Sequence, residues 1–173
     1  MRAIGLMSGT SADGIDAALL SSDGEGVVEP GPSLTRPYDA ALRARLRALD
    51  EDAEVALTEA HAEAVTALLD RTGVAAADID VIGFHGQTLW HRPEQGRTCQ
   101  IGDGDRLAAL TGIDVVNDLR SADMRAGGQG APLAPVYHRA LASGLERPLA
   151  VLNVGGVANV TWIGEGDDAL LGF

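Results

Sequence analysis

The sequence predicts an α/β fold of two related lobes, the second of which is only begun within the 173 residues. Short apolar runs typical of strands alternate with longer segments in which apolar residues recur at helical spacing. In addition, Ile4 to Leu20 sets two apolar runs around a polar tip that contains glycine, and Leu149 to Gly164 repeats this pattern. The repeat favours two lobes that each begin with a hairpin, with the two tips facing a common cleft.

The first strands are expected at Ala3 to Leu6 and at Ile15 to Leu20, on either side of the polar loop. Val27 and Val28 begin a further strand. We expect the Pro-Gly-Pro sequence of residues 30 to 32 to end it, because proline and glycine interrupt regular structure.

Two helices are expected next. Asp39 can cap the first, and the second runs from Glu54 to Arg71 and stops at Gly73. The apolar positions expected to face the core are Leu42, Leu46 and Leu49 in the first helix, and Leu57, Ala60, Ala64 and Leu68 in the second.

The remaining elements alternate in type. Asp80 to Phe84 is expected to be a buried strand that runs into the polar segment HGQT, and Ile113 to Val116 a further strand. A helix is expected around Leu107 to Leu110 and another at Val136 to Ala142. The glycine-rich segment from Ala126 to Pro132 is expected to be a loop.

Composition excludes several function classes. The formal net charge is −12 and no basic block offsets it, which argues against nucleic acid or an anionic membrane as a partner. The single cysteine, Cys99, excludes an intramolecular disulfide framework and fits a reducing compartment. The N-terminus lacks the continuous apolar core of a secretory signal, and no apolar run reaches membrane-spanning length. These features predict a cytoplasmic protein.

The loop MSGTSADGID has the composition of a phosphate-binding loop. Gly9 and Gly14 permit close backbone approach, and main-chain N–H groups could surround an anion together with the hydroxyls of Ser8, Thr10 and Ser11. Asp13 and Asp16 suit a phosphate that carries Mg²⁺, which prefers oxygen ligands. The GK[ST] ending of a P-loop and the GxGxxG dinucleotide pattern are both absent. An ordinary Asp-Gly hairpin turn is the alternative.

The segment HGQTLWHRP follows a buried strand, where α/β folds often present ligand contacts. His85 could serve there, or it could be a hydrogen-bonded structural histidine, and Trp90 could simply be a packing residue. His61 and His138 fall within expected helices and are assigned to structure. Cys99 has no nearby base and is expected to be half-buried.

The segment NDLRSADMRAGGQGAP gathers acids, arginines and flexible glycines after an expected strand. Arg120 could hold a carboxylate through two parallel hydrogen bonds. A solvated surface turn with ion pairs is the alternative. Asp103 and Asp105 could equally cap the helix that follows them.

The resemblance of this sequence to a known family rests on five motifs in a fixed order. They are MSGTSADGID, GFHGQTLWHRP, QIGDG, NDLRSADMRAGGQGAPLAP and LNVGGVANVTW. Together they resemble the 1,6-anhydro-N-acetylmuramic acid kinases over essentially the whole chain. The resemblance implies the actin-like ATPase, or ribonuclease H-like, two-lobe fold of the sugar kinase and hexokinase superfamily. The first lobe would comprise residues 1–125, and residues 126–173 would begin the second.

The resemblance also implies an activity. These kinases use ATP and water to convert 1,6-anhydro-N-acetylmuramic acid into N-acetylmuramic acid 6-phosphate during recycling of the bacterial cell wall. ATP and Mg²⁺ are the implied cofactors, the anhydro sugar is the implied partner, and a homodimer is left open. A noncatalytic nucleotide-binding or scaffold lobe is the alternative from another class, and an NAD-dependent oxidoreductase is a poorer third because the dinucleotide pattern is absent.

Site residues follow from the resemblance in three groups. The ATP phosphate loop would be Gly9, Thr10, Ser11, Ala12, Asp13, Gly14, Ile15 and Asp16, with Asp13 the candidate for Mg²⁺. The second hairpin would face the phosphates through Asn153, Gly155, Gly156 and Asn159. The sugar side would comprise His85, Gln87, Asn117, Arg120 and Gln129, with Arg120 a partner for the lactyl carboxylate.

The expected general base is not among the residues in hand. In the family, a DTGPGN-like motif follows an LLGF-like strand and supplies an aspartate that activates water. Here LLGF occupies residues 170 to 173, and neither Asp167 nor Asp168 matches the base. We therefore expect the base beyond Phe173 and no turnover by the 173-residue chain itself.

Overall fold

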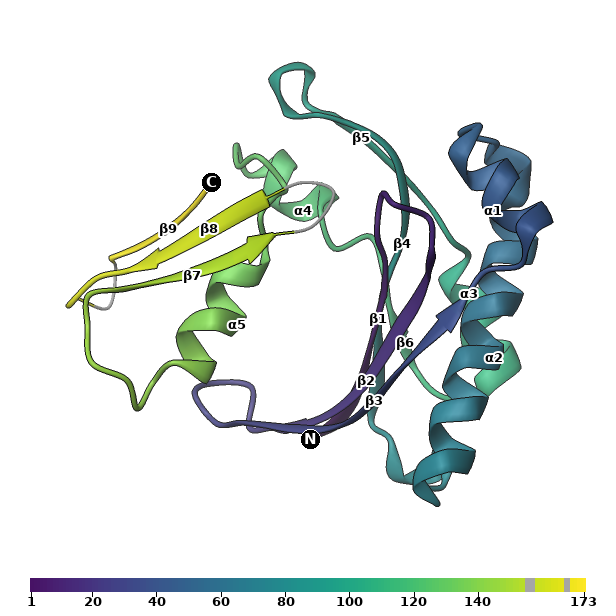
Figure 1. Cartoon of the computed structure of the whole chain (residues 1–173), viewed down its shortest axis with the longest axis horizontal. Coiled ribbons are helices and arrows are strands. Elements are labelled where there is room, and N and C mark those ends of the chain that lie inside the picture. Colours follow the sequence, from purple (N-terminus) through teal and green to yellow (C-terminus); the bar gives the residue numbers. More distant parts are fainter. Residues whose placement is uncertain (155–157, 167–168) are drawn as a thin grey trace.

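A computed structural model describes residues 1–154, 158–166 and 169–173 of the chain. These residues form a mixed α/β structure with a six-stranded and a three-stranded sheet, which confirms the α/β class expected from the sequence (Figure 1). Helices α1, α2 and α3 lie on one side of the larger sheet, and α4, α5 and the smaller sheet lie on the other. No helix in the described part of the chain combines the length and apolar character needed to cross a bilayer.

The larger sheet has the strand order β3-β2-β1-β4-β5, and β6 also pairs with β4. β1 is antiparallel to β2 and parallel to β4, so the sheet is mixed. The expected opening hairpin is confirmed. The strands are β1 Arg2–Ser8, β2 Gly14–Ser22, β3 Val28–Pro37, β4 Val81–Arg92, β5 Arg97–Ile101 and β6 Val115–Val116.

The expectation that residues 30 to 32 end a strand is wrong, because β3 continues through them to Pro37. β3 lies at the edge of the sheet and pairs with β2, so proline residues can face outward without breaking a ladder on both sides. The pairing shifts between Ala18 and Leu20, and this irregularity accommodates the Pro-Gly-Pro sequence.

The helices begin and end close to the expected residues. Asp39 caps α1 by accepting a hydrogen bond from the N–H of Leu42, and α2 ends at Gly73. Leu49 differs from expectation, because it lies past the end of α1 with a φ of 56° and is 53% exposed. The helices are α1 Ala40–Arg47, α2 Glu54–Thr72, α3 Gly104–Thr111, α4 Ser121–Arg125 and α5 Ala134–Leu141, with short 3₁₀ turns at Glu51–Ala53, Ala76–Asp78 and Pro93–Gln95.

The main core lies between α2 and one face of the larger sheet. His61 of α2 is fully buried, with Nδ1 2.8 Å from the Leu57 carbonyl oxygen and its ring edge-on to Phe84 of β4. The structural assignment of His61 is therefore confirmed. Other fully buried side chains of this core are Ile4, Ile15, Leu46, Leu57, Leu68, Ile82 and Leu107.

The smaller sheet has the order β7-β8-β9 and packs against α5. β7 and β8 form an antiparallel hairpin, as expected from the second repeat. His138 of α5 lies 2.8 Å from the Thr161 hydroxyl of β8, measured from Nδ1, in keeping with a structural role. The strands are β7 Leu149–Val154, β8 Ala158–Ile163 and β9 Leu170–Gly172. The boundary expected between residues 125 and 126 falls between α4 and α5, and the division into lobes stays a prediction.

Candidate functional site

Residues 9–13 form the tight loop between β1 and β2. The Ala12 N–H donates to the Gly9 carbonyl oxygen at 3.0 Å, and Ala12 is buried with a φ of 48°. The carbonyl oxygen of Ser11 accepts from Arg47 Nη2 of α1 at 3.4 Å, and that of Asp13 accepts from the Tyr38 N–H at 3.1 Å. Three loop carbonyls are therefore engaged within the protein, while the side chains of Thr10 and Ser11 are exposed.

Gly9 of the loop and Gly14 at the start of β2 serve different purposes. A Cβ added to Gly9 would contact only Ser11 Oγ, at 3.5 Å, so the backbone is open there. A Cβ added to Gly14 would lie 2.6 Å from the Arg36 carbonyl oxygen on β3. Gly14 therefore lets β2 and β3 pack closely, and Gly9 is the position at which a ligand could approach the main chain.

Asp13 of the loop and Asp16 of β2 both have exposed carboxylates, which are held differently. Asp13 Oδ1 accepts a hydrogen bond from Ser11 Oγ at 2.6 Å, and this bond is the main reason that the pKa of Asp13 is lowered. Asp16 lies within β2, opposite Met7, and accepts from the Thr35 hydroxyl. Ile15 between them is fully buried, so its side chain belongs to the core.

A buried polar cluster lies directly beneath the loop. The Tyr38 hydroxyl donates to Ser8 Oγ at 2.7 Å, Ser8 Oγ donates to Gln87 Oε1, and Gln87 Nε2 donates to the Gly9 carbonyl oxygen at 3.1 Å. Ser8 and Gln87 are 1% and 3% exposed. Burial raises the pKa of Tyr38 to about 12, which keeps its hydroxyl protonated as a donor. Sequence reasoning did not single out Tyr38.

A bulge in β4 separates His85 from Gln87. Leu6 of β1 pairs with Phe84, but Ser8 pairs with Gln87, so β4 carries one extra residue at this point. Gln87 consequently lies on the α2 side of the sheet with Phe84, whereas His85 lies on the opposite side. The expectation that β4 ends before the HGQT segment is wrong, because β5 pairs with the residues that follow the bulge and extends the strand to Arg92.

His85 and Arg120 form a second cluster on the face of the sheet away from α2. His85 Nδ1 donates to the Gly86 carbonyl oxygen, and Nε2 accepts from Arg120 Nη2, both at 2.8 Å. Arg120 Nη1 also donates to the Gly130 carbonyl oxygen at 2.7 Å. Burial is the main cause of the lowered pKa of His85, and the Arg120 charge lowers it further, so the imidazole is neutral and can accept.

The glycine-rich loop after α4 is held by Asp123, to which the sequence analysis gave no role of its own. Asp123 Oδ2 accepts from the Gly130 N–H at 2.7 Å. A Cβ on Gly128 would lie 2.2 Å from the same oxygen, so the loop closes around this carboxylate. Gln129 is exposed on the loop, and Gly130 links it to Arg120.

A pocket of about 260 Å³ lies beside His85, between the β4–β5 hairpin and the segment before α4. It brings Asn117 together with His85, and its polar lining also includes Gln100 and Ser121. Cys99 lies in its wall and is half-buried as expected, and burial together with nearby glutamates raises the pKa of its thiol. Residues of β4 and of the segment before α4, which are far apart in the sequence, therefore line the same polar pocket.

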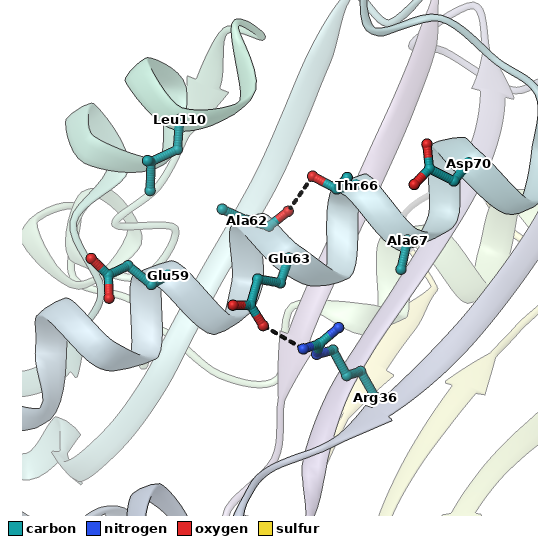
Figure 2. Close-up of a pocket in the computed structure, with 8 residues that line it drawn as sticks. All are labelled: Arg36, Glu59, Ala62, Glu63, Thr66, Ala67, Asp70 and Leu110. Atoms are coloured by element: carbon teal, nitrogen blue, oxygen red, sulfur yellow. Dashed lines mark hydrogen bonds and ion pairs between the residues drawn. The ribbon is translucent and has the colours of Figure 1, made fainter.

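A larger hollow of about 590 Å³ lies on the outer side of α2 and contains none of the residues expected in the site (Figure 2). Glu63 forms an ion pair with Arg36, and Thr66 donates its hydroxyl hydrogen to the Ala62 carbonyl oxygen at 3.1 Å. These polar groups are already satisfied by neighbours, so the loop and the His85 pocket are the stronger candidates for ligand binding.

The remaining predicted residues lie on the smaller sheet. Asn153 of β7 pairs in register with Asn159 of β8, one position before the last pair of these two strands. Gly155 and Gly156 lie outside the described residues. Within the described ranges, no group of three or more His, Cys, Asp or Glu side chains is arranged to hold a metal.

Comparison with known proteins identifies the family. The sequence profile described as anhydro-N-acetylmuramic acid kinase matches residues 1–173. The chain belongs to the anhydro-N-acetylmuramic acid kinase family. A relative of that name from Rhodospirillum rubrum is 62% identical, with 99% of this chain and 48% of the relative covered. Another from Rhizorhabdus wittichii is 55% identical, with 100% of this chain and 52% of the relative covered.

The chain spans about half the length of the family members that it matches. The solved structure of YeaZ from Pseudomonas aeruginosa is similar with a TM-score of 0.35 and 18% identity, over 99% of this chain and 63% of that one. That likeness is too slight to support an inference about the fold, and family membership rests on the sequence matches.

Proposed function

We propose that this chain supplies the first lobe and the start of the second in an actin-like ATPase fold that phosphorylates 1,6-anhydro-N-acetylmuramic acid. The reaction would consume ATP and water and release N-acetylmuramic acid 6-phosphate in the cytoplasm, during recycling of the cell wall. The family match over residues 1–173 carries this proposal. The open backbone at Gly9 and the polar pocket beside His85 support it from the geometry.

ATP phosphates would bind at the loop of residues 9–13. Gly9 leaves room for a phosphate to approach the main chain, and the exposed Thr10 and Ser11 hydroxyls can donate to its oxygens. Asp13 is exposed and ionised, so it fits as a carboxylate partner for Mg²⁺, which would be held mainly by phosphate oxygens and water. Asn153, Gly155, Gly156 and Asn159 would face the phosphates from the second hairpin.

The sugar would bind in the polar pocket on the His85 side of the sheet. Asn117 and the nearby Gln129 offer hydrogen bonds to hydroxyl and amide groups, and Arg120 supplies the positive charge for the lactyl carboxylate. His85 would line the pocket and hold Arg120, because both of its ring nitrogens are already bonded within the protein. Arg120 is held by His85 and the Gly130 carbonyl oxygen, so its guanidinium is already oriented. Turnover would also need a general base outside these residues, so we expect none from the 173-residue chain.

The decisive experiment measures Mg·ATP binding by calorimetry and ADP release with the anhydro sugar. Binding is measured on the 173-residue chain, and turnover is compared between this chain and the full-length Rhodospirillum rubrum relative. We expect binding by the chain and turnover by the relative. Gly9→Val should weaken Mg·ATP binding by about tenfold or more, because its side chain fills the approach to the backbone.

Gly26→Val is the matched control, because Gly26 lies in the turn after β2 with no atom near its missing Cβ. It should leave nucleotide affinity unchanged. Equal affinities for Gly9→Val and the wild type would contradict the loop assignment. Nucleotide binding without any turnover by the full-length relative would instead favour a noncatalytic nucleotide-binding lobe.

A further inference from the structure

Tyr38 connects the two ends of the loop of residues 9–13 from beneath. Its main-chain N–H donates to the Asp13 carbonyl oxygen at 3.1 Å, at the end of the loop. Its hydroxyl donates to Ser8 Oγ at 2.7 Å, at the start of the loop. Tyr38 is only 8% exposed, so both bonds lie within the protein and are sheltered from water.

The hydrogen bonds run in one direction from Tyr38 to the loop. Tyr38 donates to Ser8, Ser8 donates to Gln87, and Gln87 donates to the Gly9 carbonyl oxygen. The amide oxygen and nitrogen of Gln87 are therefore both used inside the protein. This burial does not suit a residue that contacts the sugar, although the sequence predicted that role for Gln87.

The arrangement also has an electrostatic consequence at the loop. The carbonyl oxygens of Gly9 and Asp13 are both drawn toward protein donors. Carbonyl oxygens are the negative ends of the peptide dipoles, so holding them inward leaves the outer side of the loop more favourable for an anion.

We propose that Tyr38, Ser8 and Gln87 are positioning residues that hold the loop of residues 9–13 in the conformation that receives the phosphates of a nucleotide. This inference rests on the proposed function for its ligand. The conformational part concerns the loop itself and can be measured without any ligand.

The test uses Tyr38→Phe in the whole 173-residue chain, which removes the hydroxyl and keeps the ring. We expect the Ala12 amide, which bonds the Gly9 carbonyl oxygen, to exchange its hydrogen about tenfold faster, as expected for loss of one buried hydrogen bond. Mg·ATP should bind several-fold more weakly. Tyr137→Phe is the matched control, because Tyr137 is 40% exposed on α5 and should change neither measurement.

Gln87→Met provides a second route, because it keeps the length of the side chain and removes both polar ends. The same selective change is expected at Ala12. Since the three residues act as one series, the double variant Tyr38→Phe with Gln87→Met should resemble either single variant instead of showing the product of their effects.

Unchanged exchange at Ala12 in both single variants would overturn the proposal. So would an equal acceleration at the Leu57 and Leu68 amides of α2, because that pattern indicates general loss of stability. If the wild-type chain binds no Mg·ATP while Tyr38→Phe still frees the loop, the positioning of the loop holds and the proposed function fails.

Discussion

The two hairpins look alike in sequence but lie in different surroundings. The β1–β2 hairpin is covered on one face by α2, and Ile4 and Ile15 on that face are fully buried. In the smaller sheet Ile163 is fully buried, yet Leu152 and Leu171 are 63% and 56% exposed. An apolar run therefore predicts a strand more reliably than it predicts how deeply that strand is buried.

Because their apolar side chains are buried to different degrees, the two sheets should be stabilised by different interactions. Apolar burial should dominate around the larger sheet, because its side chains lose contact with water when α2 packs on it. In the smaller sheet, backbone pairing and the contact with α5 contribute more of the total. Substitutions of the same chemical type should consequently have unequal effects in the two regions.

Gly86→Ala should cause the largest loss of stability, and it tests how tightly the larger sheet is packed at the bulge in β4. The new Cβ would lie 2.2 Å from the Ile101 carbonyl oxygen, and the backbone φ is 67°. We expect a loss of about 4 kcal/mol or more in the free energy of unfolding, measured by urea denaturation. Gly96→Ala is the control, since its φ of 63° is similar but no atom lies near the added Cβ, and it should cost about 1 kcal/mol.

The corresponding change in the smaller sheet is Gly164→Ala. Its Cβ would contact the half-exposed Trp162 ring, at 2.6 Å, and Ala169 Cβ, at 2.7 Å. The Trp162 ring can turn away, and relief of the Ala169 contact needs a small backbone shift, so we expect a smaller loss of about 1–3 kcal/mol. A loss equal to that of Gly86→Ala would show that the smaller sheet is packed as rigidly as the larger one.

Leu68→Ala and Leu152→Ala compare burial directly. Leu68 is fully buried in α2, so truncation should lower the free energy of unfolding by about 2–5 kcal/mol. Leu152 is 63% exposed in β7, so its truncation should change the free energy by no more than about 0.5 kcal/mol. Similar losses from the two variants, measured in the same denaturant series, would remove the distinction between the sheets.

His61 should make the larger core sensitive to acid. Burial is the main cause of lowering its pKa to about 4 in the folded chain, against 6.5 as the ordinary value. Between these values the unfolded chain binds a proton that the folded chain excludes, so stability falls as the pH drops from 6.5 toward 4. The expected contribution between pH 6 and pH 5 is about 1 kcal/mol.

The measurement is a series of urea denaturations from pH 7 to pH 4 on the wild type and on His61→Leu. The variant should lose this part of the pH dependence, whatever its stability at pH 7. An unchanged slope in the variant would show that other groups cause the acid sensitivity.

The sequence predicted the elements well where local signals are strong. Asp39 and Gly73 marked helix ends because capping depends on a few neighbouring residues. The predicted third strand ended too early, at residues 30 to 32. Proline interrupts a strand in the middle of a sheet but is tolerated in an edge strand, and the local sequence does not reveal which of the two applies.

The candidate site was less predictable because it depends on contacts between distant residues. Ser8 reaches Tyr38 and Gln87, which lie 30 and 79 residues away along the chain. Strict alternation along β4 would have put His85 and Gln87 on the same face, and the bulge at Gly86 separates them. Gly86 was the signal in the sequence for that bulge, because a glycine inside a strand often marks one. The ligand roles of these residues stay predictions.

The prolines of β3 also limit how this chain can aggregate. An exposed sheet edge offers unpaired N–H and C=O groups to a strand from another molecule, and this is a common route to fibrils. Pro30 and Pro32 lie on such an edge and lack the N–H group that an added strand would need. The Pro-Gly-Pro sequence therefore does not end the strand, and it makes the outer edge of β3 a poor template for further β-pairing.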